Sequence, residues 1–139
     1  MTRDLEFIRK QDWYTPGSDN TIIVDFDGTI CEFAYPKEGK LIADTIKALE
    51  MLKKAGFTIL IHSSRTSRKF SQEVRNENFY RMVDYLLSHG VPFDEVLKHD
   101  KPPVLAYIDD SAHRLEGDSK SSNWMKIANH CIFEQEHGR

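Results

Sequence analysis

The feature that most constrains the fold is a short run of β-branched residues, TIIVDF at 21–26. A compact apolar run of this kind is typical of a strand that is buried on both faces of a parallel sheet. A second such run, FTILI, occupies residues 57–61, and Gly56 just before it is a suitable helix end. The apolar positions between the two runs recur at helical spacing: Ile42, Ile46, Leu49 and Leu52. A strand, a helix and a strand in this order predict a right-handed crossover and a parallel sheet.

The rest of the chain continues the alternation. A helical stripe ends before Gly90 and Pro92; it consists of Phe79, Met82, Val83, Leu86 and Leu87. We expect short strands at 95–97 and 104–108, a helix over 123–128 and a last strand at 131–133. The pattern therefore predicts an α/β fold, a three-layer Rossmann-like sandwich around a central, mostly parallel sheet.

Length and composition indicate one domain. The 139 residues, 40% of them hydrophobic, suit a single core at 21–135 preceded by an arm at 1–20. No apolar run approaches the length of a membrane span, and the N-terminal residues MTRDLEFIRK are charged throughout. We therefore expect a soluble, cytoplasmic protein.

Neither cysteines nor charge points to another class of protein. Cys31 and Cys131 lie far apart without metal-type spacing, so we interpret both as reduced thiols. A net charge of −3 argues against a general nucleic-acid coat, although a local basic patch stays open.

Polar residues follow the predicted strands at the points where they end. Asp25 and Asp27 close the first strand, and Ser63 and Ser64 follow the second. Asp109 and Asp110 follow a later strand, and a basic stretch at 98–101 precedes that strand. Because ligands of open α/β sheets bind beyond the carboxyl ends of the strands, we expect these groups to converge.

Each group also has an ordinary interpretation. Asp27-Gly28 is a common turn, paired aspartates often cap helices, and serines after a strand are often loop residues. Their joint occurrence at consecutive strand ends favours a site. Carboxylates that crowd together repel one another unless a cation lies between them, which points to a metal.

These residues resemble the four motifs of the haloacid dehalogenase superfamily, in the family's order. DFDGT at 25–29 is similar to the first motif, Ser63 to the second, Lys101 to the third, and Asp109 with Asp110 to the fourth. The resemblance extends from about residue 21 to residue 115. The stretch GVPFDEVLKHDKPP before YIDD is similar to small phosphatase-like members of this family.

The resemblance implies roles in phosphoryl transfer. Asp25 is the expected nucleophile and Asp27 the general acid and base. The expected Mg²⁺ ligands are Asp25, the backbone carbonyl of Asp27 and one of Asp109 and Asp110, of which we prefer Asp110. The remaining contacts to the phosphate or substrate would come from Ser63, Lys101 (with Lys98 as the alternative lysine), Thr29, Ser64 and Arg65.

The chain leaves no room for the cap domain that many members of the family carry. We therefore expect an open site, or one covered by the arm, by a flap at 33–40, or by a second subunit. The loop at 65–69 is either solvated or recognises further acidic groups of the substrate. We treat three histidines only as candidate substrate contacts: His62, His99 and His113.

The sequence thus predicts a Mg²⁺-dependent phosphomonoester hydrolase. Phosphotransfer to another acceptor and a non-catalytic binding module with the same fold are the alternatives. The substrate stays open among sugar phosphates, nucleotides and a polynucleotide end, and a homo-oligomer is compatible with the sequence.

Overall fold

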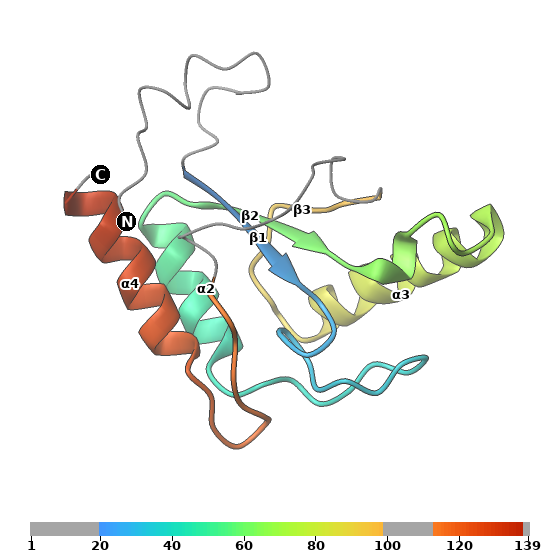
Figure 1. The fold of residues 1–139 in the computed structure, drawn as a ribbon, viewed down its shortest axis with the longest axis horizontal. Coiled ribbons are helices and arrows are strands. Elements are labelled where there is room, and N and C mark those ends of the chain that lie inside the picture. The colour runs from blue at the N-terminus through green and yellow to red at the C-terminus, as the bar shows by residue number, and fades with distance from the viewer. Residues whose placement is uncertain (1–19, 99–112, 138–139) are drawn as a thin grey trace, which may run out of the picture.

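The computed structural model describes residues 20–98 and 113–137. This part of the chain contains three strands, three α-helices and one short 3-10 helix; Figure 1 shows how the strands and α-helices are arranged. In chain order they are β1 (Thr21–Asp25), α2 (Thr45–Lys54), β2 (Thr58–His62), the 3-10 helix η2 (Ser64–Thr66), α3 (Gln72–Ser88), β3 (Glu95–Val96) and α4 (Trp124–His137). None of the described helices is long and apolar enough to cross a membrane.

The three described strands form a parallel sheet in the order β1-β2-β3. The register aligns Asp25 with His62 and Leu60 with Glu95. The predicted α/β class with a parallel sheet is therefore confirmed. Because the strands run in the same direction, β1 and β2 end at the same edge, which brings the segments after Asp25 and His62 together.

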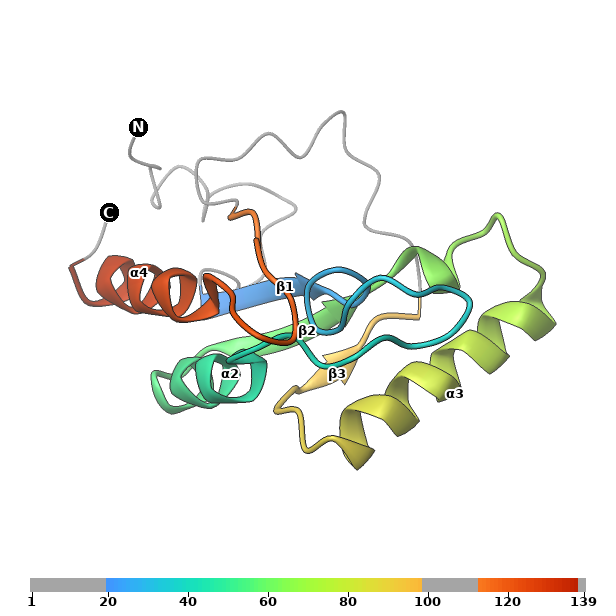
Figure 2. The same ribbon diagram turned by 90° about the horizontal axis from the view of Figure 1, so that it is seen from below.

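The core lies between the sheet and the two crossover helices. Figure 2 shows α2 and α3 on the same side of the sheet, and Val24, Ile59 and Ile61 are buried in the same cluster as residues of both helices. Burying one such side chain contributes about 1.5–3 kcal/mol relative to leaving it exposed. Helix α4 packs against α2, with Trp124 only 3% exposed. This packing fixes the carboxyl edge of the sheet.

The prediction that the first strand is buried on both faces is wrong for β1. Val24 is buried, but its neighbour Ile23 is 45% exposed. Successive side chains of a strand point to opposite faces, so β1 alternates although its sequence is continuously apolar. An apolar run does not say how many faces are covered.

The predicted last strand at 131–133 is also wrong, because these residues belong to α4. Trp124 and Ala128 are buried, and Cys131 and Ile132 are partly buried against the core. This spacing continues a helical stripe, and no turn residue interrupts it. Helix α3 likewise begins earlier than the apolar stripe suggested, at Gln72. The Ser71 hydroxyl caps it by accepting a hydrogen bond from the Val74 amide at 3.2 Å.

Two predicted segments lie outside the described residues: the arm over 1–19 and the strand at 104–108.

Candidate active site

The segment after β1 forms a tight turn. The amide of Ile30 donates to the Phe26 carbonyl at 2.9 Å, and the amide of Gly28 donates to the Cys31 carbonyl at 2.7 Å. Gly28 has a φ of 81°, in the left-handed region that favours glycine. The turn and the site are thus compatible interpretations of the same sequence, because the turn fixes where the two aspartates point.

Asp25 is the accessible carboxylate of the pair. It ends β1, and its side chain is 58% exposed. His62, its partner in the parallel register, places Nδ1 3.4 Å from Asp25 Oδ1. A carboxylate in this position can be reached by a ligand above the strand ends.

Asp27 lies in a closed environment, with its side chain 13% exposed. Arg65 holds both of its oxygens: Nε donates to Oδ2 and Nη2 donates to Oδ1, each at 2.8 Å. This two-point contact is the strong geometry of an arginine–carboxylate pair. The carboxylate is therefore oriented by the protein itself.

Arg65 is nearly inaccessible, with its side chain 1% exposed. Its Nη1 donates to Glu38 at 2.9 Å, and its Nη2 donates to the Lys37 carbonyl at 2.9 Å. The guanidinium also lies 5.0 Å from the centre of the Tyr35 ring. Burial by itself would lower the pKa of Arg65, but hydrogen bonds and charges from Asp27 and Glu38 outweigh it and raise the pKa. The guanidinium stays charged.

These contacts change the role that the sequence suggested for Arg65. As a predicted substrate contact it would present its donors to solvent. In the structure, its guanidinium contacts the protein's own carboxylates and carbonyls. Asn78 of α3 fixes the backbone too, by donating to the Arg65 carbonyl at 2.9 Å. Arg65 positions Asp27 instead of facing an open surface.

The flap, residues 33–40, is anchored to the same cluster. Glu38 contacts Arg81 of α3 at 3.0 Å in addition to Arg65. The Tyr85 hydroxyl donates to the Gly39 carbonyl at 2.9 Å. Phe33 at the start of the flap is 74% exposed. The flap is thus fixed at its base and presents an apolar side chain outward.

Two of the predicted phosphate or substrate contacts, Ser63 and Ser64, lie in the segment after β2, and a third, Thr29, lies in the turn after β1. Ser63 is 6% exposed, and its Oγ accepts a hydrogen bond from the Arg65 amide at 3.1 Å. No contact in the described part of the chain uses its hydroxyl proton, so Ser63 can still donate. Ser64 is exposed at the start of η2. Thr29 is half-buried, and its carbonyl accepts from Trp124 Nε1 at 3.0 Å.

The donor atoms at the end of β1 suit a hard cation such as Mg²⁺. The Asp25 carboxylate is exposed, and no donor within residues 20–98 and 113–137 reaches the backbone carbonyl of Asp27. The described residues contain no group of three metal-ligating side chains. The other predicted residues lie outside the described part of the chain: Lys101, Asp109 and Asp110.

Sequence reasoning named His62 only as a candidate substrate contact and missed other members of the cluster. The parallel register could have placed His62 beside Asp25, because both residues end strands that pair directly. No sequence signal marked Glu38 or Asn78, which come from a loop and from a helix face. Cys31 beside the turn is fully buried, and this burial raises the pKa of its thiol to about 11.

Comparison with known proteins adds fold information. No family model and no curated protein matches the chain. A crystal structure from Vibrio cholerae matches with a TM-score of 0.58 and 27% identity over 84% of this chain and 98% of that one. A conserved protein from Bacteroides thetaiotaomicron matches at 29% identity and a TM-score of 0.42; the chain spans about half of it, 55%. The Vibrio structure supports the α/β fold, and neither match identifies an activity.

Proposed function

We propose that the protein is a Mg²⁺-dependent phosphomonoester hydrolase of the haloacid dehalogenase type. One observation supports this most: an exposed carboxylate, Asp25, ends β1 two residues before a carboxylate, Asp27, that Arg65 holds in a fixed position. A nucleophile needs access to the substrate, and a proton-transfer group needs a defined position. Asp25 meets the first requirement because it is exposed, and Asp27 meets the second because Arg65 holds it.

In the first step, an oxygen of Asp25 attacks the phosphorus of the ester. The bond from phosphorus to the ester oxygen breaks, and an aspartyl-phosphate forms on Asp25. The leaving oxygen carries away the electron pair of that bond and takes a proton from Asp27. Ser63 donates its hydroxyl proton to a phosphoryl oxygen.

In the second step, Asp27 accepts a proton from water. The resulting hydroxide attacks the phosphorus, the bond to Asp25 breaks, and inorganic phosphate leaves. Both oxygens of Asp27 are occupied by Arg65 in the described state. Proton transfer therefore requires Asp27 to leave at least one of these contacts during the cycle.

Mg²⁺ would be held by the Asp25 carboxylate, the Asp27 carbonyl and one of Asp109 and Asp110, of which we prefer Asp110. When bound, it would offset the negative charge between the carboxylate and the phosphoryl group. Cys31 and Cys131 form no disulfide with each other, which fits the cytoplasmic location that we propose.

A panel of phosphomonoesters tests the proposal. We expect phosphate release from at least one class of ester with Mg²⁺ present, and none above background in excess chelator. Addition of Mg²⁺ should restore it. Undiminished turnover in chelator contradicts the metal role.

A binding module with the same fold is the second candidate. The observation in its favour is the closed cluster of Arg65, Asp27, Glu38 and Arg81, whose two positive and two negative charges pair within the protein. Absence of phosphate release from every ester, with the protein folded and Mg²⁺ present, favours this candidate.

A further inference from the structure

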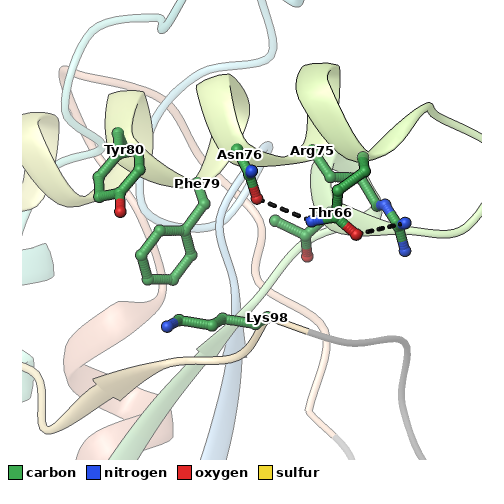
Figure 3. Close-up of a pocket in the computed structure, with 7 residues that line it drawn as sticks. Thr66, Arg75, Asn76, Phe79, Tyr80 and Lys98 are labelled. Atoms are coloured by element: carbon green, nitrogen blue, oxygen red, sulfur yellow. Dashed lines mark hydrogen bonds between the residues drawn. The ribbon is translucent and has the colours of Figure 1, made fainter.

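A second feature of the structure is a pocket of about 170 Å³ beside η2, the short helix after β2. It is formed by α3, by Thr66 of η2 and by Lys98 shortly after β3. Figure 3 shows the α3 side chains above and Lys98 beneath Phe79. The full lining is Thr66, Gln72, Arg75, Asn76, Phe79, Tyr80 and Lys98. Two of these residues are cationic and none is acidic.

The two cations are unmatched, unlike Arg65. Within the described chain, neither Arg75 nor Lys98 has a carboxylate at ion-pair distance. Lys98 Nζ lies 5.1 Å from the centre of the Phe79 ring, which directs the ammonium along the pocket wall. The pocket therefore carries two positive charges that have no ion-paired carboxylate among the described residues.

Polar side chains hold Arg75 in place. Arg75 Nη2 donates to Gln72 Oε1 at 2.8 Å, and Gln72 Nε2 donates to Asn76 Oδ1 at 2.8 Å, as Figure 3 shows. The Nε atom of Arg75 is buried and has no hydrogen-bond partner in the described residues. A buried donor without an acceptor is costly.

Thr66 connects this pocket to the site. Its hydroxyl contacts the Ser63 carbonyl at 3.2 Å on one side and the Leu97 carbonyl at 3.3 Å on the other. Ser63 is the residue that would donate to the transferring phosphoryl group. The pocket lining therefore begins three residues after Ser63 in the chain, at a residue that is hydrogen-bonded to Ser63.

We propose that this pocket binds a second anionic group of the substrate, a carboxylate or a phosphate, at Arg75 with Lys98 contributing charge. The inference rests on the proposed phosphatase function for its substrate, but its binding part can be measured independently. It narrows the substrate to phosphomonoesters with a further acidic group in the same molecule.

The test uses straight-chain ω-phosphoryloxy carboxylic acids of increasing length, each paired with the alkyl phosphate of the same length. Because the chain length varies, the series samples different distances between the phosphate and the carboxylate of the test compound. We expect wild-type kcat/KM to favour the acid over its alkyl partner at some length. Arg75→Gln should reduce this preference roughly 10- to 100-fold, the range for a hydrogen bond to a charged group, with alkyl phosphates unaffected. Arg75→Lys should retain part of this preference. Lys47→Gln, at an exposed cation of α2 outside the pocket lining, is the control.

A second experiment uses calorimetry to measure how the acids and the alkyl phosphates bind to two proteins. One is the Asp25→Asn variant, and the other is the double variant that also carries Arg75→Gln. Weaker binding of the acids alone in the double variant supports the pocket, even if no ester is hydrolysed and the phosphatase proposal fails. Hydrolysis with an unchanged acid preference in Arg75→Gln at every length overturns the pocket proposal and leaves the phosphatase intact. Equal binding of acids and alkyl phosphates also overturns it.

Discussion

The two aspartates at the end of β1 have different surroundings, although only Phe26 separates them in the sequence. We call the surroundings of Asp25 the open side and those of Asp27 the closed side. On the open side, Asp25 is 58% exposed and lies beside His62. On the closed side, Asp27 is 13% exposed and lies against Arg65, which is 1% exposed. The same residue type therefore has two environments, one reachable and one fixed. In the proposed mechanism, the reachable carboxylate attacks the substrate and the fixed one transfers the proton.

The largest expected effect separates the two aspartates by chemistry. Asp27→Asn should slow hydrolysis of alkyl phosphates by ~10²–10⁴-fold, because proton transfer to the leaving oxygen is lost. Aryl phosphates with acidic leaving groups need little protonation, so formation of the intermediate from them should be affected less. Pre-steady-state kinetics on both ester types measures this. An equal loss on all esters would contradict the assigned role.

The next effect concerns the stability of the closed side. Arg65→Met should lower the free energy of unfolding by roughly 3 kcal/mol, the lower part of the range for a broken buried pair, because Asp27 and Glu38 keep some exposure. Urea denaturation measures it. Arg68→Met, an exposed cation of the same loop, is the control and should stay within about 0.5 kcal/mol. A similar loss in both variants would remove the distinction between the two sides.

Cys31 reports on opening of the closed side. Its pKa is raised to about 11 from the ordinary 9.0, so at neutral pH its thiolate fraction is about 100-fold lower than that of an ordinary thiol. We expect a thiol reagent to label Cys131 before Cys31 under native conditions. Mass spectrometry of the labelled protein measures this order. Arg65→Met should speed labelling of Cys31. Equal rates for the two cysteines in the wild type would contradict a closed environment.

The smallest effect lies away from both sides. The amide of Ile59 donates to Asp94 at 2.6 Å, and Lys53 Nζ lies 2.7 Å from the same oxygen, so the pKa of Asp94 is lowered. A lowered folded-state pKa adds stability above the ordinary carboxyl pKa, and this stability is lost as the pH falls through the folded-state value. Since the pair is about one-third exposed, Asp94→Asn should cost only about 0.2–1 kcal/mol at neutral pH.

Unfolding curves between neutral and acidic pH check this sign. The difference between wild type and Asp94→Asn should shrink on acidification. A difference that grows would show that Asp94 does not carry the expected charge interaction.

The sequence predicted the parts that depend on local pattern. The first two strands, the helix between them and the shared edge for Asp25 and Ser63 follow from apolar periodicity and parallel topology. The contacts of Arg65 could not be predicted, because its partners come from three separate segments. The error at 131–133 has a similar cause: an apolar triplet fits a strand or a helix, and packing against the core decides.

The most direct test of the central claim is to locate a phosphoryl group on the protein during turnover. The wild type and the Asp27→Asn and Asp25→Asn variants are each mixed with Mg²⁺ and an ester that the wild type hydrolyses. The samples are then quenched in acid and digested for mass spectrometry. The account predicts a phosphoryl group on Asp25, more abundant in Asp27→Asn because its hydrolysis is slowed, and none in Asp25→Asn. Phosphate release without this intermediate, or undiminished release by Asp25→Asn, would contradict it.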